Sequence, residues 1–291
     1  MADPTGEVER PRVAFQGEPG AFAEEGVLSA FCAPEAVAVP TWHEVFEAVH
    51  SREVEAGVVP IERSAAGSVR EIYDLLQNFD EMRIVAEVVV PVHLALLALP
   101  GQTIDQIGRV YSIAQALDQA DEYLRKRSWQ VMTSYNTAGS AKAIADAHEM
   151  GAAAIASPRV ADLYGLEILA NDIQAGENRT RFAVISRYHN KLPDGWLAPD
   201  TLSGPMKTTI FWVARNVPGS LYRCLGCFAD RDVNLSRLES RPRDLRHWDY
   251  VFTADLDSEP DNSDCAAALV ALLSEARSVR VAGVYHRAAE E

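Results

Sequence analysis

The sequence predicts an α/β protein of two lobes, resembling a periplasmic binding protein in architecture, followed by a smaller α+β domain. The chain has 291 residues, 48% of them hydrophobic, which is enough for two domains that each bury a core. Short apolar runs alternate with helical patterns over the first two thirds, as in α/β folds. A polar stretch with prolines and glycines, residues 188–206, then separates this part from a different order of elements.

Nine apolar runs in the first part are expected to form strands, with helical patterns between most of them. The alternation favours largely parallel strands. The runs are Arg12–Phe15, Ala36–Val39, Ala56–Val59, Ile84–Val90, Val92–Leu99, Arg109–Tyr111, Gln130–Met132, Ala152–Ile155 and Phe182–Ser186. Two long runs meet at Pro91, where the chain is expected to cross between lobes. Ligands of α/β proteins bind in clefts of this kind.

The last part of the chain has the order βαββαβ, which is typical of a ferredoxin-like sandwich. Its expected elements are a strand at Thr208–Ala214, a helix at Ser220–Ala229, strands at Val233–Leu238 and Tyr250–Ala254, a helix at Asp264–Ala276 and a strand at Val279–Val284. We therefore predict a two-lobed domain over residues 11–187, a linker over 188–206 and an α+β domain over 207–286. The tail after Tyr285 is expected to fray.

Charge and composition exclude several classes of partner. The formal net charge is -15 and the isoelectric point about 4.9, so nucleic acid and anionic membranes are not expected to bind. The N-terminal ten residues are polar, without the apolar core of a signal peptide. The longest apolar run, Val88–Leu99, contains Pro91 and His93 and is too short to span a bilayer. A cytoplasmic protein without a membrane partner is expected.

Metal sites are not expected either. The four cysteines, of which Cys224 and Cys227 form a Cys-x-x-Cys pair, should be free thiols in a reducing compartment. No second pair of cysteines or histidines lies nearby, so this pair is expected to face a helical core. The single Glu-x-x-His, in Trp42–His50, is read as part of an amphipathic helix, because a carboxylate di-metal site needs two.

The most informative window is Asn178–Phe182, which sets the hydroxyl of Thr180 between Arg179 and Arg181 at the end of an apolar run. Arginine matches carboxylate geometry, and the hydroxyl between two cations can donate to a leaving oxygen. A capped strand end with solvated arginines is the alternative.

Four strand-to-helix turns carry polar side chains on the lobes that should face each other. One turn, Val13–Gly20, contains Gly17 and Gly20 and could receive an anion on backbone N–H groups. The others present Glu62, Arg63 and Ser64 in Pro60–Val69, Ser112 and Gln115 in Ser112–Leu117, and Thr137 in Asn136–Lys142. Each turn taken alone is explained by helix capping.

Together these windows, over nearly the whole chain, resemble the prephenate dehydratase family. Its pattern has a Gly-x-x-Gly-x-(Phe/Tyr) turn, Pro-Ile-Glu-Asn-Ser, Ser-His-Pro-Gln-Ala-Leu, a Thr-Ala window and Asn-x-Thr-Arg-Phe. In this family an ACT regulatory domain follows. Its two sequence motifs, called the two marks below, are intact at Asn216–Tyr222 and Glu239–Pro242. The resemblance implies conversion of prephenate to phenylpyruvate, or of arogenate to phenylalanine, without a cofactor, and feedback inhibition by phenylalanine.

The resemblance also implies roles for individual residues. Thr180 would donate toward the leaving hydroxyl, with Glu62 as a second catalytic residue, and Arg181 would hold a carboxylate. Substrate would further contact Arg63, Ser64, Ser112, Gln115, Thr137 and Phe182. Phenylalanine would bind at Asn216, Pro218, Gly219, Ser220, Leu221, Glu239, Ser240, Arg241 and Pro242. A homodimer or homotetramer is implied, because ACT domains usually associate.

The chain departs from the family pattern at Arg63, which replaces Asn, at Ile113–Ala114, which replace His-Pro, and at Ala66, which replaces Gly. Either Arg63 turns to Glu62 or solvent in an ordinary dehydratase, or it changes what the pocket accepts. The second case would give an arogenate dehydratase or a prephenate decarboxylase that does not aromatise its product. A non-catalytic phenylalanine-sensing protein and, outside the family, a two-lobed solute-binding protein are the remaining alternatives.

Overall fold

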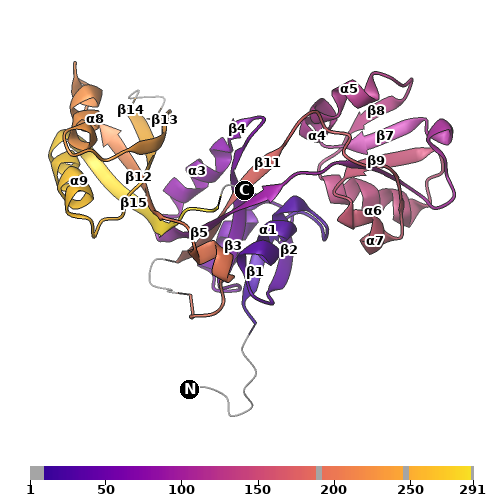
Figure 1. Cartoon of the computed structure of the whole chain (residues 1–291), viewed down its shortest axis with the longest axis horizontal. Helices are drawn as coiled ribbons and strands as arrows, with labels where there is room; N and C mark the ends of the chain where they lie inside the picture. Colours follow the sequence, from indigo (N-terminus) through magenta and orange to yellow (C-terminus); the bar gives the residue numbers. More distant parts are fainter. Residues whose placement is uncertain (1–9, 188–191, 245–248, 290–291) are drawn as a thin grey trace, which may run out of the picture.

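The computed structural model describes residues 10–187, 192–244 and 249–289. They form three bodies side by side, with the C-terminal unit at one end, the first lobe in the middle and the second lobe at the other end (Figure 1). The three bodies share two β-sheets. A ten-stranded sheet runs in the order β13-β14-β12-β15-β5-β11-β3-β1-β2, with β4 paired to β3, and a five-stranded sheet runs β10-β6-β9-β7-β8.

The first lobe combines the beginning of the chain with one late strand. Its strands are β1 (Arg12–Gln16), β2 (Glu35–Val39), β3 (Ala56–Arg63), β4 (Gly67–Ser68), β5 (Met82–Pro91) and β11 (Arg179–Arg187), and its helices are α1 (Phe22–Ala30), α2 (Trp42–His50) and α3 (Arg70–Asn78). The capping box between Thr41 and Glu44 fixes the start of α2, which is the helix expected from its amphipathic pattern.

The second lobe holds the middle of the chain. Its strands are β6 (Ala95–Ala98), β7 (Arg109–Ser112), β8 (Gln130–Thr133), β9 (Ala152–Ala156) and β10 (Glu167–Ala170), and its helices are η1 (Ile104–Gln106), α4 (Ala114–Gln119), α5 (Asp121–Leu124), α6 (Thr137–Ala147) and α7 (Arg159–Tyr164). The crossing expected at Pro91 is confirmed, because β5 ends there in one sheet and β6 begins the other.

The C-terminal unit has the predicted βαββαβ order. It comprises β12 (Met206–Ala214), α8 (Ser220–Ala229), β13 (Leu235–Asp244), β14 (Asp249–Leu256), α9 (Ser263–Glu275) and β15 (Ala276–His286). Its sheet joins that of the first lobe at Gly283, which pairs with Ile84 of β5. A side chain at Gly283 would come within 2.3 Å of the Ile84 carbonyl oxygen, so this junction needs glycine.

Two expectations about the strands are wrong. The sheets are mixed rather than largely parallel, because β11 runs antiparallel to β3 and β5, and β6 runs antiparallel to β9 and β10. Strands β4 and β10 were not expected. Strand direction follows from which distant segments pair, and a pattern of apolar runs does not contain that information.

The side chains of β11 alternate between two hydrophobic cores. Phe182 and Val184 belong to the cluster that α1 covers, whereas Ala183 and Ile185 belong to the cluster that α2 and α3 cover. The second cluster continues into the C-terminal unit through Phe211. One face of β11 therefore turns toward the second lobe and the other toward the C-terminal unit.

The segment expected to be a linker is packed in its described part. Residues 192–205 include η2 (Pro199–Leu202), and Ala198 N–H donates to the Ala30 carbonyl at 2.9 Å. The tail after Tyr285 was expected to fray, but its backbone makes two hydrogen bonds to other parts of the chain. Arg287 N–H donates to the Pro205 carbonyl at 2.8 Å, and Ala288 N–H donates to Glu87 at 3.0 Å.

The cysteines are free, as expected, and Cys224 and Cys227 lie buried in α8, where burial raises the pKa of both thiols. Within the described ranges, no group of three or more histidine, cysteine and acidic side chains is placed to hold a metal ion. No helix in that same part of the chain is long and apolar enough to cross a membrane.

Candidate active site

A cleft of about 560 Å³ lies between the first and second lobes. Five of the residues selected from the sequence line it, namely Arg63, Gln115, Thr137, Thr180 and Phe182. The rest of the wall is formed by Gln16, Ala21, Phe22, Ala23, Pro40, Thr41, Trp42, Pro60, Glu71, Val92, Leu94, Ile113, Ala114, Ala116, Gln119, Thr133, Ser134, Tyr135, Asn136 and Asn178. Both lobes and both segments that cross between them contribute.

One side of the cleft is built where β11 lies antiparallel to β3. Thr180 lies opposite Arg63 and Phe182 opposite Pro60, while a bulge leaves Ile61 without a partner on β11. Opposed side chains share a face of the sheet, and all four of the paired residues line the cleft. The bulge therefore brings a cation, a hydroxyl and an aromatic ring to the same face.

Thr180 is held rigidly by strands on both sides, because β11 pairs with β3 and with β5 at this position. The residue is 6% exposed, and its hydroxyl makes no hydrogen bond to any side chain or backbone group in the described ranges. Phe182, 3% exposed, packs beside it. The backbone of Thr180 is thus held by two strands, and its hydroxyl is available to a ligand.

Arg63 is the one cation among the described residues that line the cleft. Burial lowers the pKa of its guanidinium, since removing a cation from water disfavours the charged form. The guanidinium has no hydrogen-bond or ion-pair partner in the part of the chain that the structure describes, and the one lining carboxylate, Glu71, does not pair with it. Arg63 does not turn to Glu62, which binds Arg181 instead.

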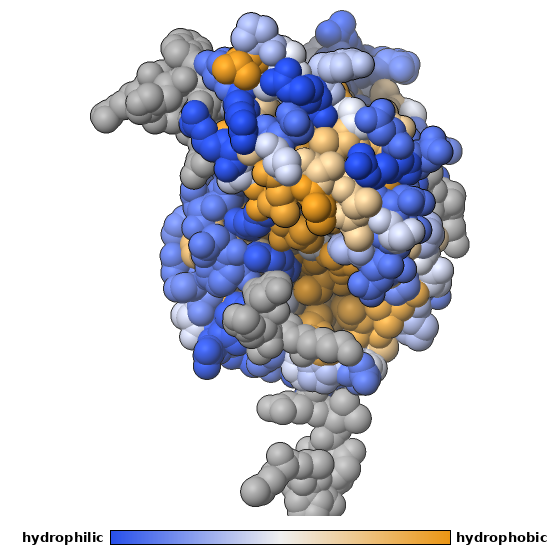
Figure 2. All heavy atoms as spheres, turned by 90° about the vertical axis from the view of Figure 1, so that its left-hand side faces the viewer, coloured by the Kyte–Doolittle hydropathy of each residue, from blue (hydrophilic) through white to orange (hydrophobic). Residues whose placement is uncertain are grey.

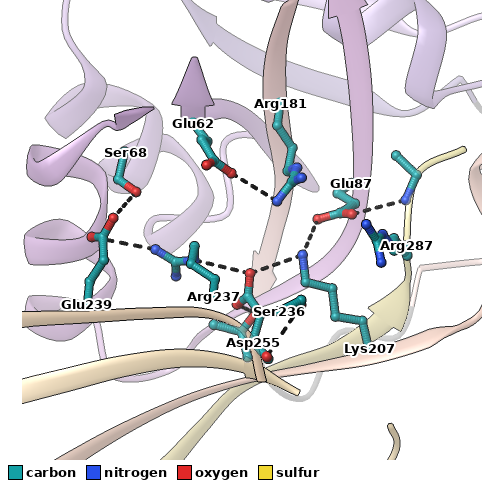
Figure 3. Close-up of polar contacts among 12 residues, drawn as sticks. Glu62, Ser68, Glu87, Arg181, Lys207, Ser236, Arg237, Glu239, Asp255 and Arg287 are labelled. Carbon is teal, nitrogen blue, oxygen red and sulfur yellow. Dashed lines mark hydrogen bonds and ion pairs between the residues drawn. The ribbon is translucent and has the colours of Figure 1, made fainter. Parts of the chain in front are cut away.

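Arg181 and Glu62 were expected in the cleft, and the structure corrects this placement. Neither lines the cleft; they form an ion pair at 3.0 Å on the opposite face of the sheet. Figure 3 shows both side chains extending toward the side on which Arg237 of the C-terminal unit lies. The reason is the two-residue period of a strand: if Thr180 faces the cleft, Arg181 cannot.

Two serines expected at the substrate also lie outside the cleft. The Ser112 hydroxyl is fully buried and donates to the Ile155 carbonyl at 2.6 Å, so it joins neighbouring parts of the second-lobe sheet. The Ser64 hydroxyl donates to Asn178 Oδ1 at 3.2 Å and accepts the Arg179 N–H at 2.9 Å. Ser112 is therefore structural, and Ser64 acts on the cleft only through Asn178.

The second lobe contributes polar groups at the starts of two helices. Gln115 stands in the first turn of α4, and Thr137 is the first residue of α6. Asn136 caps α6 by accepting the Gly139 N–H at 2.8 Å. Across the cleft, α1 begins at Phe22, which also lines the wall. Helix N-termini favour negative charge, so α6 makes the cleft suitable for an anion, whereas the first turn of α1 already carries Glu24 and Glu25.

The glycine turn of β1 brings the lobes close together. Gly17 has a φ of +125°, and a Cβ there would lie 2.6 Å from Asn136 Nδ2 of the opposite lobe. Beside it, Glu18 pairs with Lys142 at 2.9 Å. The turn expected to receive an anion instead forms part of the contact between lobes, because the Gly17 N–H donates to the Val39 carbonyl at 2.9 Å and the Gly20 N–H donates to Glu24 at 2.7 Å.

Comparison with known proteins explains this arrangement. The family model described as prephenate dehydratase matches residues 13–190. The chain belongs to the prephenate dehydratase family. It is accordingly an enzyme, a lyase of the dehydratase type. This confirms the resemblance drawn from the sequence and the two-lobed fold that came with it.

The relatives agree over nearly the whole chain. Arogenate dehydratase/prephenate dehydratase 1, chloroplastic, of Arabidopsis thaliana is 36% identical over 96% of this chain and 73% of its own length. A prephenate dehydratase of Arthrobacter aurescens, solved with L-Phe, is 32% identical with a TM-score of 0.82, covering 95% of this chain and 90% of that one. GqqA, described as a novel type of quorum-quenching acylase, is 29% identical with a TM-score of 0.84, covering 96% and 98%.

The two sequence marks expected to bind phenylalanine lie on different elements of the C-terminal unit of this dehydratase-family protein, one before α8 and one on β13. Asn216, Pro218 and Gly219 are exposed before α8, Leu221 is 37% exposed, and the buried Ser220 donates its hydroxyl to the Arg215 carbonyl. The other mark, Glu239, Ser240, Arg241 and Pro242, lies on the edge strand β13. Glu239 accepts a hydrogen bond from Ser68, and Arg241 pairs with Asp74 at 2.7 Å. This mark therefore docks on the first lobe.

A buried polar network joins the same two bodies (Figure 3). The side chain of Lys207 is 2% exposed and contacts Glu87 of β5 and Asp255 of β14 at 3.0 Å each. Arg237 also reaches Asp255, at 3.1 Å. Burial alone would raise the pKa of Asp255, but Arg237 and Lys207 outweigh it, and the pKa lies below its usual value.

Sequence reasoning leaves out several residues of the cleft wall. Asn136 and Asn178 both stand in windows selected from the sequence. Asn136 is explained there as a helix cap and Asn178 as part of the Asn-x-Thr-Arg-Phe motif, so neither is predicted to line the cleft. Phe22 occupies the aromatic position of the glycine turn, so the family pattern contains a signal for it. Glu71 and Trp42 have no such signal, because their approach to the cleft depends on how distant segments pack.

Proposed function

We propose that this enzyme is a prephenate dehydratase that converts prephenate to phenylpyruvate. The observation that carries the proposal is the unpaired Arg63 beside the unpaired hydroxyl of Thr180 on one wall of the cleft, within the described residues. Prephenate is a dianion whose reaction needs a bound carboxylate and assistance to a leaving hydroxide. The proposed catalytic domain spans residues 11–187, and the proposed regulatory ACT domain spans 207–286.

The chemistry needs no electron carrier. The bond between the ring and its carboxylate breaks to release carbon dioxide, the electron pair moves through the ring, and the C–O bond at the opposite ring carbon breaks. The departing hydroxide takes a proton and leaves as water. Thr180 would donate a hydrogen bond to that oxygen, and positioned assistance of this kind is worth about 10²- to 10⁴-fold. Arg63, Gln115, Thr137 and the ring of Phe182 would hold the substrate.

Arogenate is the second candidate substrate, because the Arabidopsis relative is named for both reactions. A decarboxylation that leaves the ring unaromatised is the alternative that Arg63 raises. Incubation of the purified protein with prephenate and, separately, with arogenate at neutral pH should give phenylpyruvate and phenylalanine, respectively, if both are accepted. Identification of the products by chromatography decides among the cases, and a protein that converts neither compound would refute the proposal.

The role of Thr180 has its own test. Thr180→Ala should lower turnover by about 10²-fold or more without unfolding the protein, and Thr180→Ser should retain more activity because it keeps the hydroxyl. Turnover of the Ala variant is measured against circular dichroism of the same sample. Wild-type turnover in that variant would rule out the role.

We further propose that phenylalanine regulates the enzyme through the C-terminal unit. The support is the pair of ACT marks and the related Arthrobacter enzyme, which was solved in complex with L-Phe. One mark precedes α8 and the other lies on β13, and we propose that each phenylalanine contacts one mark from each of two copies. Titration calorimetry with phenylalanine should show binding to the intact protein and none after Gly219→Val, which blocks the turn where φ is +79°. Absence of heat with the intact protein would contradict the proposal.

A homodimer or homotetramer is therefore part of the proposal. Figure 2 shows apolar side chains gathered on the end of the molecule that the C-terminal unit occupies. Val270 and Leu273 of α9 are 65% and 60% exposed, which leaves an apolar helix face that a second copy could cover. Light scattering on the purified protein tests this. We retain a cytoplasmic location as a proposal, although the Arabidopsis relative is named chloroplastic.

The acylase activity ascribed to GqqA is not proposed for this chain. Amide hydrolysis needs an activated nucleophile or a metal-bound water. The described residues that line the cleft include no cysteine and no histidine, and the lining Ser134 is hydrogen bonded to Ser140. The described wall instead carries Arg63, whose charge suits the binding of an anion.

A further inference from the structure

Asn178 lies in the segment that returns from the second lobe to β11, two residues before Thr180. It is 7% exposed, and it lines the cleft. Its backbone carbonyl accepts the Val92 N–H at 2.7 Å, so the two crossing segments are joined at this point. Its side-chain oxygen, Oδ1, accepts the Ser64 hydroxyl at 3.2 Å.

The hydrogen bonds of Ser64 decide which way the amide of Asn178 points. Ser64 Oγ already accepts the Arg179 N–H at 2.9 Å, and Ser64 N–H donates to the Arg179 carbonyl at 2.9 Å. A hydroxyl has a single proton, and here it goes to Asn178 Oδ1. The amide nitrogen, Nδ2, must then point away from Ser64.

Asn178 Nδ2 has no acceptor among the residues that the structure describes. Because this donor lies in the cleft wall and is not enclosed by protein, a ligand or water oxygen that enters the cleft can reach it. Asn136 repeats the arrangement from the second lobe. Its Oδ1 accepts the Gly139 N–H, and its Nδ2 lies toward Gly17 across the cleft.

We propose that Asn178 is a substrate-binding residue whose amide nitrogen donates to a carboxylate oxygen of the substrate, and that Ser64 is the positioning residue that orients it. The inference rests on the proposed function and assigns to Ser64 a different role from the direct contact expected from the sequence. Arg63 supplies charge on the same wall, and Asn178 supplies a directed donor beside it. The fixed amide lets the cleft distinguish an acceptor oxygen from a donor group at that position.

The test is a double-mutant cycle on kcat/KM, with prephenate and arogenate as substrates. Asn178→Asp replaces the donor by an acceptor of the same shape and should lower kcat/KM by about 100-fold, the usual loss for one preorganised donor. Ser64→Ala should lower it by about 10-fold, mainly through a higher KM, whereas Ser64→Thr keeps the hydroxyl and should restore most of the activity. Asn171→Asp, in the exposed part of the same crossing segment, is the matched control and should change little.

The double variant separates positioning from a merely structural role. If Ser64 acts through Asn178, then Ser64→Ala combined with Asn178→Ala should be no less active than Asn178→Ala alone. Multiplied losses in the double variant, or full activity of Asn178→Asp, would overturn the inference while leaving the proposed function intact. A wild-type protein that converts neither substrate would overturn both. Thermal unfolding of every variant confirms that the comparison is made between folded proteins.

Discussion

Replacement of Arg63 should change activity and stability in opposite directions. Arg63→Asn removes the one cation of the described cleft wall, to which we assign a carboxylate of the substrate. A charge-assisted hydrogen bond contributes about 1.5–3 kcal/mol. The expected loss in kcat/KM for prephenate is therefore about 10- to 150-fold. The loss should be smaller for arogenate, whose ammonium group the cation repels, so the preference for prephenate should fall by about tenfold.

The stability change has the other sign. Burial lowers the pKa of Arg63, which means that the folded protein disfavours the charged form that exists at neutral pH. No partner in the described residues offsets this, so the variant should be at least as stable as the wild type. Active-site residues commonly show this opposition between stability and activity.

The assay is steady-state kinetics with both substrates, together with urea unfolding followed by circular dichroism. Arg125→Asn is the matched control, because the Arg125 side chain is 78% exposed and pairs with Asp121 on a surface helix. Two results would refute the reasoning: kcat/KM for prephenate within twofold of wild type, or a clear loss of stability in Arg63→Asn. Faster formation of phenylpyruvate would instead mean that Arg63 restricts an otherwise ordinary dehydratase site.

Two further predictions concern buried charge. Lys207→Met leaves two buried carboxylates without their shared cation and should destabilise the protein by about 3–5 kcal/mol in urea unfolding. Lys126→Met, in an exposed ion pair, is the control and should change stability by less than about 0.5 kcal/mol. Equal losses in the two variants would contradict the stabilising role given to Lys207. Burial raises the pKa of Glu25 above 4.5, so its contribution to stability is present below pH 4.5 and is lost as pH rises through the folded-state value. Glu25→Gln should thus raise the free energy of unfolding at pH 7 and make that free energy less dependent on pH above 4.5. Glu122→Gln, at an exposed position, is the control and should leave the free energy of unfolding unchanged. A Glu25→Gln protein that is less stable at pH 7 would show that the hydrogen bond between Glu25 and Ser157 outweighs the cost of burial.

The sequence was sufficient for the family and for most of the element order. The helix expected at Ser220–Ala229 has those bounds in the structure, and each of the other predicted strands and helices of the C-terminal unit overlaps an observed one. Apolar periodicity and turn residues act locally, so they can be read without knowing the fold. Strands β4 and β10 were not predicted, because β4 has only two residues and the residues of β10 are exposed or half-buried, so neither strand has a clear apolar pattern.

The sequence also identified the windows that carry the site, but not which side chains face it. Thr180 and Arg181 are neighbours in one motif, yet the cleft receives the first while the second pairs with Glu62 on the opposite face. The bulge that leaves Ile61 without a partner on β11 sets Arg63 beside Thr180. No local sequence pattern predicts this bulge. Which face of β11 meets the second lobe is decided by the packing of α1 on one side and of the C-terminal unit on the other. Such choices depend on contacts between residues far apart in the chain, and only the tertiary structure contains them.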